Sequence, residues 1–200
     1  MADKGKSALL IIDVQKDFCE GGALEVPQGD RVVPVLNRFA EQIKAQGDAI
    51  YATRDWHPAK SRHFKAYGGL WPVHCVAGTP GAAFHPDLRL PPGTVVISTG
   101  QELDQDGYSA FEGTTDSGRN LAAELGARGV RRLYVGGLAT DYCVKHSVLD
   151  ALKAGFTVTV LIDAIAGVDV HPGDSARALN EMEEAGAAFM ATEDEAPTTL

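Results

Sequence analysis

Cys143 lies where an apolar run gives way to a helical pattern, a position at which a chain can activate a nucleophile. The run 133–135 ends at Gly136-Gly137, and the apolar residues after Cys143 recur on one helical face. Thr140 and Asp141 favour a helix N-cap, so Cys143 is expected in the first helical turn. Free backbone N–H groups and the helix dipole favour a thiolate there and can hold an oxyanion. A small buried side chain is the alternative, and this stretch alone leaves both interpretations open.

A second group of chemically active residues lies in a histidine-rich part of the chain. Its nitrogen and oxygen ligands are Asp55, His57, His63 and His74. A carboxylate with imidazoles suits zinc, and also Fe2+ or Mn2+, while leaving positions for water or substrate. Because this spacing is only moderately specific, loop histidines without a metal are the alternative. His85 and His171 each precede a proline and are interpreted as turn residues.

Asp13 ends a strongly apolar run, residues 8–12. A carboxylate is costly there unless it is paired or lies exposed in a cleft, which makes Asp13 a candidate general base. A carboxylate that only caps a helix or bonds a loop is the alternative. Phe18, Trp71 and Tyr108 are candidates for the walls of the cleft, with core packing as the alternative for each.

Apolar runs of strand length alternate with helical patterns along the chain. The strands are expected within 8–12, 49–52, 95–97, 133–135, 158–162 and 187–190, and the helices within 32–43, 116–128, 143–154 and 174–185. Asp30 is the expected N-cap of the first helix, and glycines follow the helices. This alternation predicts an α/β fold with three layers, α/β/α, in which helices cover both faces of a mostly parallel, Rossmann-like sheet of about six strands.

The same alternation places the candidate residues at one edge of the sheet. Asp13 ends the first strand, and Asp55 and His57 follow the second. Thr99 follows the third strand, and Cys143 follows the fourth. Ligands of open α/β sheets bind outside the carboxyl ends of the strands, so one crevice is expected to collect these residues. Residues 54–92, rich in proline, glycine, histidine and tryptophan, are expected to form a long functional loop beside it.

Composition limits the class of protein. A length of 200 residues with 44% hydrophobic content predicts one domain, residues 1–200, with a flexible tail from about residue 192. The net charge of −9 argues against nucleic acid or an anionic membrane as partner. The run 8–12 is too short for a signal peptide or a membrane span, and the three cysteines suggest no disulfide set. A cytoplasmic protein is therefore expected.

Five ordered motifs together resemble the isochorismatase-like cysteine hydrolases, and most closely their nicotinamidase/pyrazinamidase branch. They are residues 10–15 with 17–18, 53–58, 71–75 with 78–81, 108–111, and 137–144. The resemblance runs through nearly the whole chain. The Asp-Trp-His motif with the Trp-Pro-x-His motif separates nicotinamidases from isochorismatases, which lack this metal site.

The resemblance implies an amidase that converts nicotinamide or pyrazinamide to the acid and ammonia through a cysteine thioester. Cys143 would attack the carboxamide carbon, Asp13 would move protons, and the amides of Ala139 and Cys143 would hold the oxyanion beside a Leu138-Ala139 peptide bond that is commonly cis in the family. One divalent metal would orient the pyridine ring, with zinc (Zn2+) preferred over Fe2+ or Mn2+. Its ligands would be Asp55, His57, His74 and His63. Substrate contacts would come from Phe18, Trp71, Tyr108 and Tyr142.

Thr99 is the position at which this chain departs from the family. The family has a catalytic lysine in a Lys-Gly pair there, and this chain has Thr99-Gly100. Threonine gives no positive charge to a thiolate at Cys143, and Lys16 and Lys145 are expected to be solvated surface residues. Two alternatives follow: a weakly active or inactive binding protein, and an amidase for another small amide, against which the intact metal motif argues. The expected partner is a small-molecule amide, and a homo-oligomer is left open.

Overall fold

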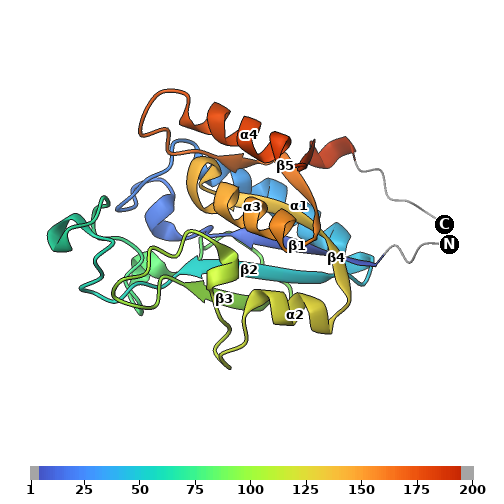
Figure 1. Ribbon diagram of the computed structural model, residues 1–200, viewed down its shortest axis with the longest axis horizontal. Coiled ribbons are helices and arrows are strands. Elements are labelled where there is room, and N and C mark those ends of the chain that lie inside the picture. Colours follow the sequence, from blue (N-terminus) through green and yellow to red (C-terminus); the bar gives the residue numbers. More distant parts are fainter. Residues whose placement is uncertain (1–4, 195–200) are drawn as a thin grey trace.

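Six parallel strands form one sheet in the computed structural model, which describes residues 5–194. In chain order they are β1 (Lys6–Ile12), β2 (Ala49–Asp55), β3 (Val95–Thr99), β4 (Val130–Leu138), β5 (Thr157–Ala166) and β6 (Ala188–Met190). The order in the sheet is β3-β2-β1-β4-β5-β6, so the winding reverses between β1 and β4 (Figure 1). This is the doubly wound, Rossmann-like order, in which ligands bind where the winding reverses.

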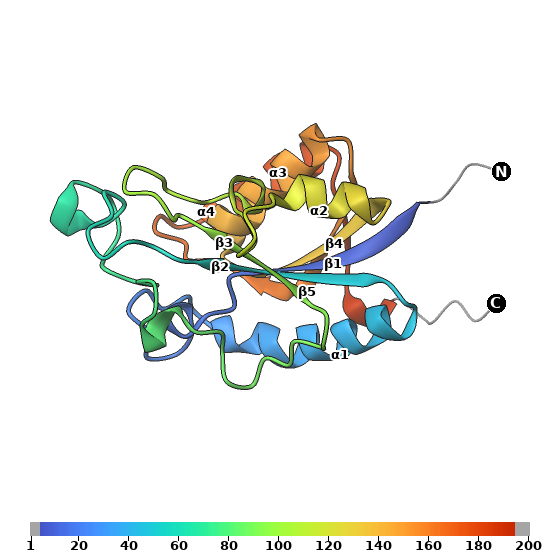
Figure 2. The same cartoon turned by 90° about the horizontal axis from the view of Figure 1, so that it is seen from below.

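Helices cover both faces of the sheet. The α-helices of the described residues are α1 (Val32–Ala45), α2 (Leu121–Ala127), α3 (Lys145–Lys153) and α4 (Asp174–Glu184). Figure 2 shows α1 on one side of the strands and α2, α3 and α4 on the other. The predicted three-layer α/β/α arrangement is confirmed.

Two apolar cores result from the strand geometry of β1. Its successive side chains point to opposite faces, so Leu9 and Ile11 pack on the side of α1, whereas Leu10 and Ile12 pack on the side of α2 and α3. All four side chains are fully buried. A central parallel strand must be apolar on both faces for this reason, which is why residues 8–12 form an unbroken apolar run.

Two helix starts differ from the sequence-based expectation. The helix expected from residue 116 begins at Leu121, because the side chain of Asn120 caps it by accepting a hydrogen bond from the N–H of Ala123 at 2.8 Å. Asp30 does not cap α1: a short 3-10 turn (Gly29–Arg31) precedes that helix, and the carboxylate of Asp30 accepts the N–H of Glu20 at 2.8 Å instead.

The segment between β2 and β3 extends past the carboxyl ends of the strands (Figure 1). It contains two short 3-10 turns, Lys65–Tyr67 and Pro80–Ala82, and corresponds to the loop expected at residues 54–92. Asp17 attaches it to the turn after β1, because its carboxylate accepts the N–H of Cys75 at 2.7 Å. The loop therefore lies against the edge of the sheet where ligands are expected.

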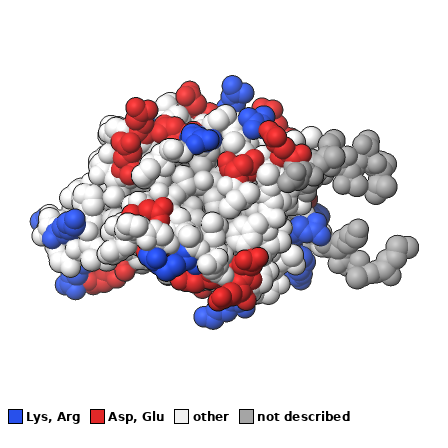
Figure 3. Space-filling view, turned by 90° about the horizontal axis from the view of Figure 1, so that it is seen from above, with Lys and Arg blue, Asp and Glu red and all other residues white. Residues whose placement is uncertain are grey.

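The tail expected from about residue 192 begins with Thr192, whose side chain is hydrogen bonded to the rest of the fold. Thr192 is buried, and its hydroxyl donates to the carboxylate of Asp163 at 2.6 Å. The rest of that tail, residues 195–200, lies outside the described residues. Within residues 5–194, none of the helices combines the length and the hydropathy needed to cross a bilayer. Figure 3 shows acidic and basic side chains interspersed over one face of the molecule.

Candidate active site and metal centre

The carboxyl ends of four neighbouring strands carry the predicted site residues. Asp13 directly follows β1, Asp55 ends β2, and Thr99 ends β3 as the register partner of Asp55. Cys143 lies in a π-helical turn (Thr140–Val144) between β4 and α3. Functional atoms of Asp13, Asp55 and Cys143 all lie within 4.8 Å of one another. The sheet thus brings these three residues into one crevice, as the sequence predicts.

The turn around Cys143 is built differently from the expected capped helix. Its N-cap position is Ala139, which makes no side-chain cap, so Thr140 and Asp141 are not the caps. The carboxylate of Asp141 accepts the main-chain N–H groups of residues 168–169 at 2.9 and 2.8 Å. It therefore fastens the segment after β5 to the turn that carries the cysteine.

The peptide bond between Leu138 and Ala139 is cis, as the family resemblance implies. Ala139 and Cys143 line the same pocket. Their predicted role as oxyanion donors remains a prediction.

Asp13 is fixed beside the thiol of Cys143. The carboxylate of Asp13 accepts a hydrogen bond from the hydroxyl of Thr53 at 2.6 Å. The main-chain N–H of Asp13 donates to the same hydroxyl oxygen of Thr53 at 3.1 Å. The backbone φ of 46° at Asp13 lies in the left-handed region, which residues other than glycine seldom adopt. Burial, followed by the charge of Asp55, raises the pKa of Asp13 well above its usual value. A carboxyl group with this environment holds a proton more readily than an exposed one, which suits it to accept the proton of a neighbouring thiol.

The pKa of the Cys143 thiol is higher than a position at a helix start alone would suggest. Burial raises its pKa well above the ordinary value, and the charges of Asp13 and Asp55 raise it further. Desolvation and two like charges thus outweigh the dipole of a short turn. Of the two lysines near the site in sequence, Lys16 is exposed as expected, whereas Lys145 is partly buried and pairs with Glu181 at 3.2 Å.

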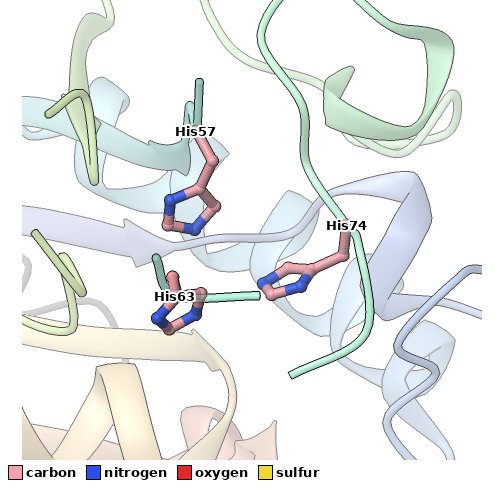
Figure 4. Close-up of side chains that lie close together, drawn as sticks. All are labelled: His57, His63 and His74. Carbon is pink, nitrogen blue, oxygen red and sulfur yellow. The ribbon is translucent and has the colours of Figure 1, made fainter. Parts of the chain in front are cut away.

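Three histidine side chains converge on one another (Figure 4). Ligand nitrogens of His57, His63 and His74 lie within 4.8 Å of one another, and all three residues are buried. Oδ2 of Asp55 is 3.3 Å from Nε2 of His57 and 3.7 Å from Nε2 of His74. Burial opposes ionisation of Asp55, but the close approach of these two imidazoles holds its pKa below the usual range. The four predicted ligands are therefore neighbours.

Each of the three imidazoles is oriented by a partner at its Nδ1 atom. The pairs are His57 with the carbonyl of Gly100 at 3.2 Å, His63 with the carboxylate of Asp106 at 2.8 Å, and His74 with the carbonyl of Pro72 at 2.8 Å. These partners accept hydrogen bonds, so each neutral ring carries its proton on Nδ1 and keeps a lone pair on Nε2.

The histidine cluster fits a divalent cation. Nε2 of His57 is buried and has no hydrogen-bond partner among the described residues. A buried polar atom without a partner is costly, whereas a metal ligand is expected to have this arrangement, with its other nitrogen held by an outer acceptor. One carboxylate and three imidazole nitrogens form a donor set suited to zinc.

A small pocket lies between the thiol and the histidines. Its aromatic and aliphatic walls are Phe18, Leu24, Trp71, Tyr108, Tyr142 and Val168. Trp71 donates its Nε1–H to the hydroxyl of Tyr108 at 2.8 Å and meets the ring of Tyr142 edge on at 4.8 Å. The four predicted aromatic residues thus lie together; Leu24 and Val168 were missed because they lie in loops without apolar periodicity.

Thr99 is buried at the base of this site. Its hydroxyl donates to Oδ1 of Asp55 at 3.0 Å, which leaves Oδ2 facing the histidines. The position where the family has a lysine therefore lies beside the acidic cluster, and in this chain it provides a hydroxyl.

Two buried or bonded residues were missed by the sequence reasoning. Gln15 is fully buried, and its side-chain amide bonds both the N–H and the carbonyl of Asp55, at 2.8 and 2.9 Å. The sequence signal that could have identified Gln15 is a polar residue only two positions after Asp13. Asp106 had no such signal, because it lies in an acidic loop together with Glu102 and Asp104.

Comparison with known proteins finds close relatives. The family model described as Isochorismatase domain matches residues 7–194. The nicotinamidase of Escherichia coli is 41% identical over 94% of this chain and 95% of its own length. The nicotinamidase/pyrazinamidase of Mycobacterium tuberculosis is 39% identical over 89% of this chain and 95% of its own length. The structure of the pyrazinamidase of Pyrococcus horikoshii, solved in complex with zinc, is 46% identical and superposes with a TM-score of 0.86 over 93% of this chain and 99% of that one.

Proposed function

The chain belongs to the isochorismatase family, and on this basis we propose that it hydrolyses nicotinamide, and likewise pyrazinamide, to the corresponding acid and ammonia. The observation that carries the proposal is that Cys143, which clusters with Asp13, lines the same pocket as His63 and His74 of the histidine cluster. Cys143 and Asp13 can cleave a carboxamide, and the cluster supplies a site for a pyridine or pyrazine nitrogen on the same molecule. The names of the nicotinamidase and pyrazinamidase relatives support this substrate class.

The first half of the reaction forms a thioester on Cys143. Its sulfur attacks the carboxamide carbon while Asp13 accepts the thiol proton, and the main-chain N–H groups of Ala139 and Cys143 hold the developing oxyanion. Asp13 then gives that proton to the amide nitrogen. The C–N bond breaks, ammonia leaves, and Asp13 is again a carboxylate.

The second half releases the acid. Asp13 removes a proton from water as the water oxygen attacks the thioester carbon, and the C–S bond then breaks. The departing sulfur takes the proton back from Asp13, so the thiol is restored. Oxidation of Cys143 would remove the nucleophile, so a reducing compartment such as the cytoplasm would favour the proposed activity.

The pocket walls orient the substrate ring. Phe18 and Trp71 offer apolar surface to a flat heteroaromatic ring whose carboxamide faces Cys143. Asp55, His57, His63 and His74 would hold the divalent metal, zinc before Fe2+ or Mn2+. When bound, the metal would supply a Lewis-acid contact for the ring nitrogen.

Ammonia release from a small panel of amides tests the proposed function. At micromolar protein we expect release from nicotinamide and pyrazinamide, and much less from benzamide, which has the same shape without a ring nitrogen. A carbamoylated amine should be a poor substrate. Preference for the carbamoylated amine would contradict the substrate assignment, and tight nicotinamide binding without any ammonia would favour the binding protein that Thr99 suggests.

Zinc binding should weaken as the pH falls below about 6, because each imidazole must be neutral to donate its lone pair. Burial lowers the pKa of His63, so protonation of this ligand should require more acid than protonation of an exposed histidine. Equilibrium dialysis with zinc across this range, followed by elemental analysis, measures the effect. Zinc content well below one ion per chain at neutral pH, even after zinc is added, would contradict the site.

A further inference from the structure

The end of β3 and the loop that follows it contact three of the four proposed metal ligands. The contacts are Thr99 with Asp55 at 3.0 Å, Gly100 with His57 at 3.2 Å, and Asp106 with His63 at 2.8 Å. The loop, residues 99–107, comes from a different part of the sequence than the ligands, which lie between positions 55 and 74. It therefore forms an outer layer that can orient the ligands without binding the metal itself.

Two glycines close this loop on itself. Gly100 and Gly107 have φ values of 63° and 76°, in the left-handed region. A Cβ atom on Gly107 would collide with the main chain of Gly100, and a Cβ atom on Gly100 would collide with the ring of His57. Because only glycine permits these approaches, the two ends of the loop lie in contact, and Asp106 is held next to the histidine cluster.

Asp106 differs from the other two histidine partners. His57 and His74 are held by main-chain carbonyl groups, whereas His63 is held by a carboxylate, which makes a stronger, charge-assisted hydrogen bond. The side chain of Asp106 is 64% exposed, and that of His63 is 3% exposed. A surface residue therefore fixes a buried ring, and it can be replaced without opening a cavity in the core.

We propose that Asp106 is the positioning residue that makes His63 a metal ligand. Its carboxylate accepts a hydrogen bond from the Nδ1–H of His63. This bond selects the tautomer that leaves the Nε2 lone pair facing the cluster. Without this acceptor nothing holds the proton on Nδ1, so the ring can change tautomer, and only three ligands keep a fixed lone pair. This inference rests on the metal site proposed above and extends it to a residue that does not touch the metal.

Zinc affinity of matched variants tests the proposal. Asp106→Ala removes the acceptor, Asp106→Asn keeps an oxygen that can accept the same hydrogen bond, and Asp104→Ala is the control. Asp104 lies in the same loop, is 69% exposed, and pairs with Arg62, the residue before His63, at 2.7 Å. Competition with a chromophoric chelator for zinc alone should show about 10- to 100-fold weaker binding for Asp106→Ala. Asp106→Asn should recover most of this loss, and Asp104→Ala should stay within about twofold of the wild type.

Ring-nitrogen NMR of the zinc-free proteins adds a readout that a loosened loop would not change. His63 should carry its proton on Nδ1 in the wild type and in Asp104→Ala, and should show a mixture of tautomers in Asp106→Ala. A wild-type protein that fails to take up zinc would overturn the metal site and this inference together. If the wild type binds zinc tightly, equal affinity in Asp106→Ala, or an equal loss in Asp104→Ala, would overturn the role of Asp106 alone.

Discussion

Cys143→Ala is expected to lower the release of ammonia from nicotinamide to the background rate, a loss on the order of 10⁴-fold or more. Of the three cysteines, Cys143 alone lines the pocket and lies with Asp13 and Asp55 in one cluster. No thioester can form without its sulfur. Alanine keeps the turn and leaves the histidine cluster unaltered, so zinc content and the circular dichroism spectrum should be unchanged.

The matched control is Cys19→Ala, which removes the same atoms from a buried cysteine outside this pocket. It should retain turnover. Iodoacetamide should label Cys143 before the other cysteines, slowly at neutral pH and faster as the pH rises, because burial and two carboxylates raise the pKa of this thiol and the thiolate forms only in base. If Cys143→Ala keeps most of its activity, then no thioester forms on this residue.

The fold follows from the sequence because its central strand has little freedom. Residues 8–12 are apolar on both faces, and only a parallel sheet covered on both sides buries such a run. The residues at which the strands end were harder to predict from the sequence. β2 continues through Thr53 to Asp55 and β3 continues to Thr99, since their ends are set by pairing with each other and not by hydrophobicity.

The site was predictable where it depends on the strands and unpredictable where it depends on loops. Asp13, Asp55 and Cys143 meet because the carboxyl ends of parallel strands share one edge. Asp30 and Asp141 were wrongly expected to cap helices, because an aspartate suits a distant loop N–H equally well, and the partner is set by tertiary structure. Asp106 depends on the path of a glycine-bounded loop, which no periodicity encodes.

At Cys143 the helix start and the acidic neighbours act in opposite directions on the thiol, and the neighbours are expected to prevail when Asp13 is ionised beside it. A helix start should stabilise a thiolate, yet the burial of the thiol and its two acidic neighbours raise the thiol pKa. The acidic pair Asp13 and Asp55 cannot be balanced by Thr99, which brings a hydroxyl to the position where the family has a lysine. The missing charge therefore bears directly on the rate of the first step.

Thr99→Lys is expected to raise nicotinamide turnover by roughly ten- to a thousandfold, the contribution of one electrostatic or proton-transfer partner. The hydroxyl of Thr99 lies 3.0 Å from Oδ1 of Asp55, whose carboxylate shares a cluster with Asp13 and Cys143. An ammonium group introduced there would offset the acidic charges and lower the pKa of the thiol. A lowered pKa means that the thiolate forms at a lower pH, so the alkylation profile of Cys143 should move towards acid.

Thr99→Met is the control that separates charge from size, because methionine also removes the hydroxyl bond to Asp55 and adds a chain of similar length without an ammonium group. It should give no increase in turnover and no shift of the alkylation profile towards acid. Zinc content must be equal in the compared proteins, since Asp55 is a proposed ligand. If the lysine variant is no faster than the methionine variant and its alkylation profile is unchanged, then Cys143 is activated without a cation. Proton transfer to Asp13, whose own raised pKa already suits it to hold the thiol proton, would then be sufficient for the first step.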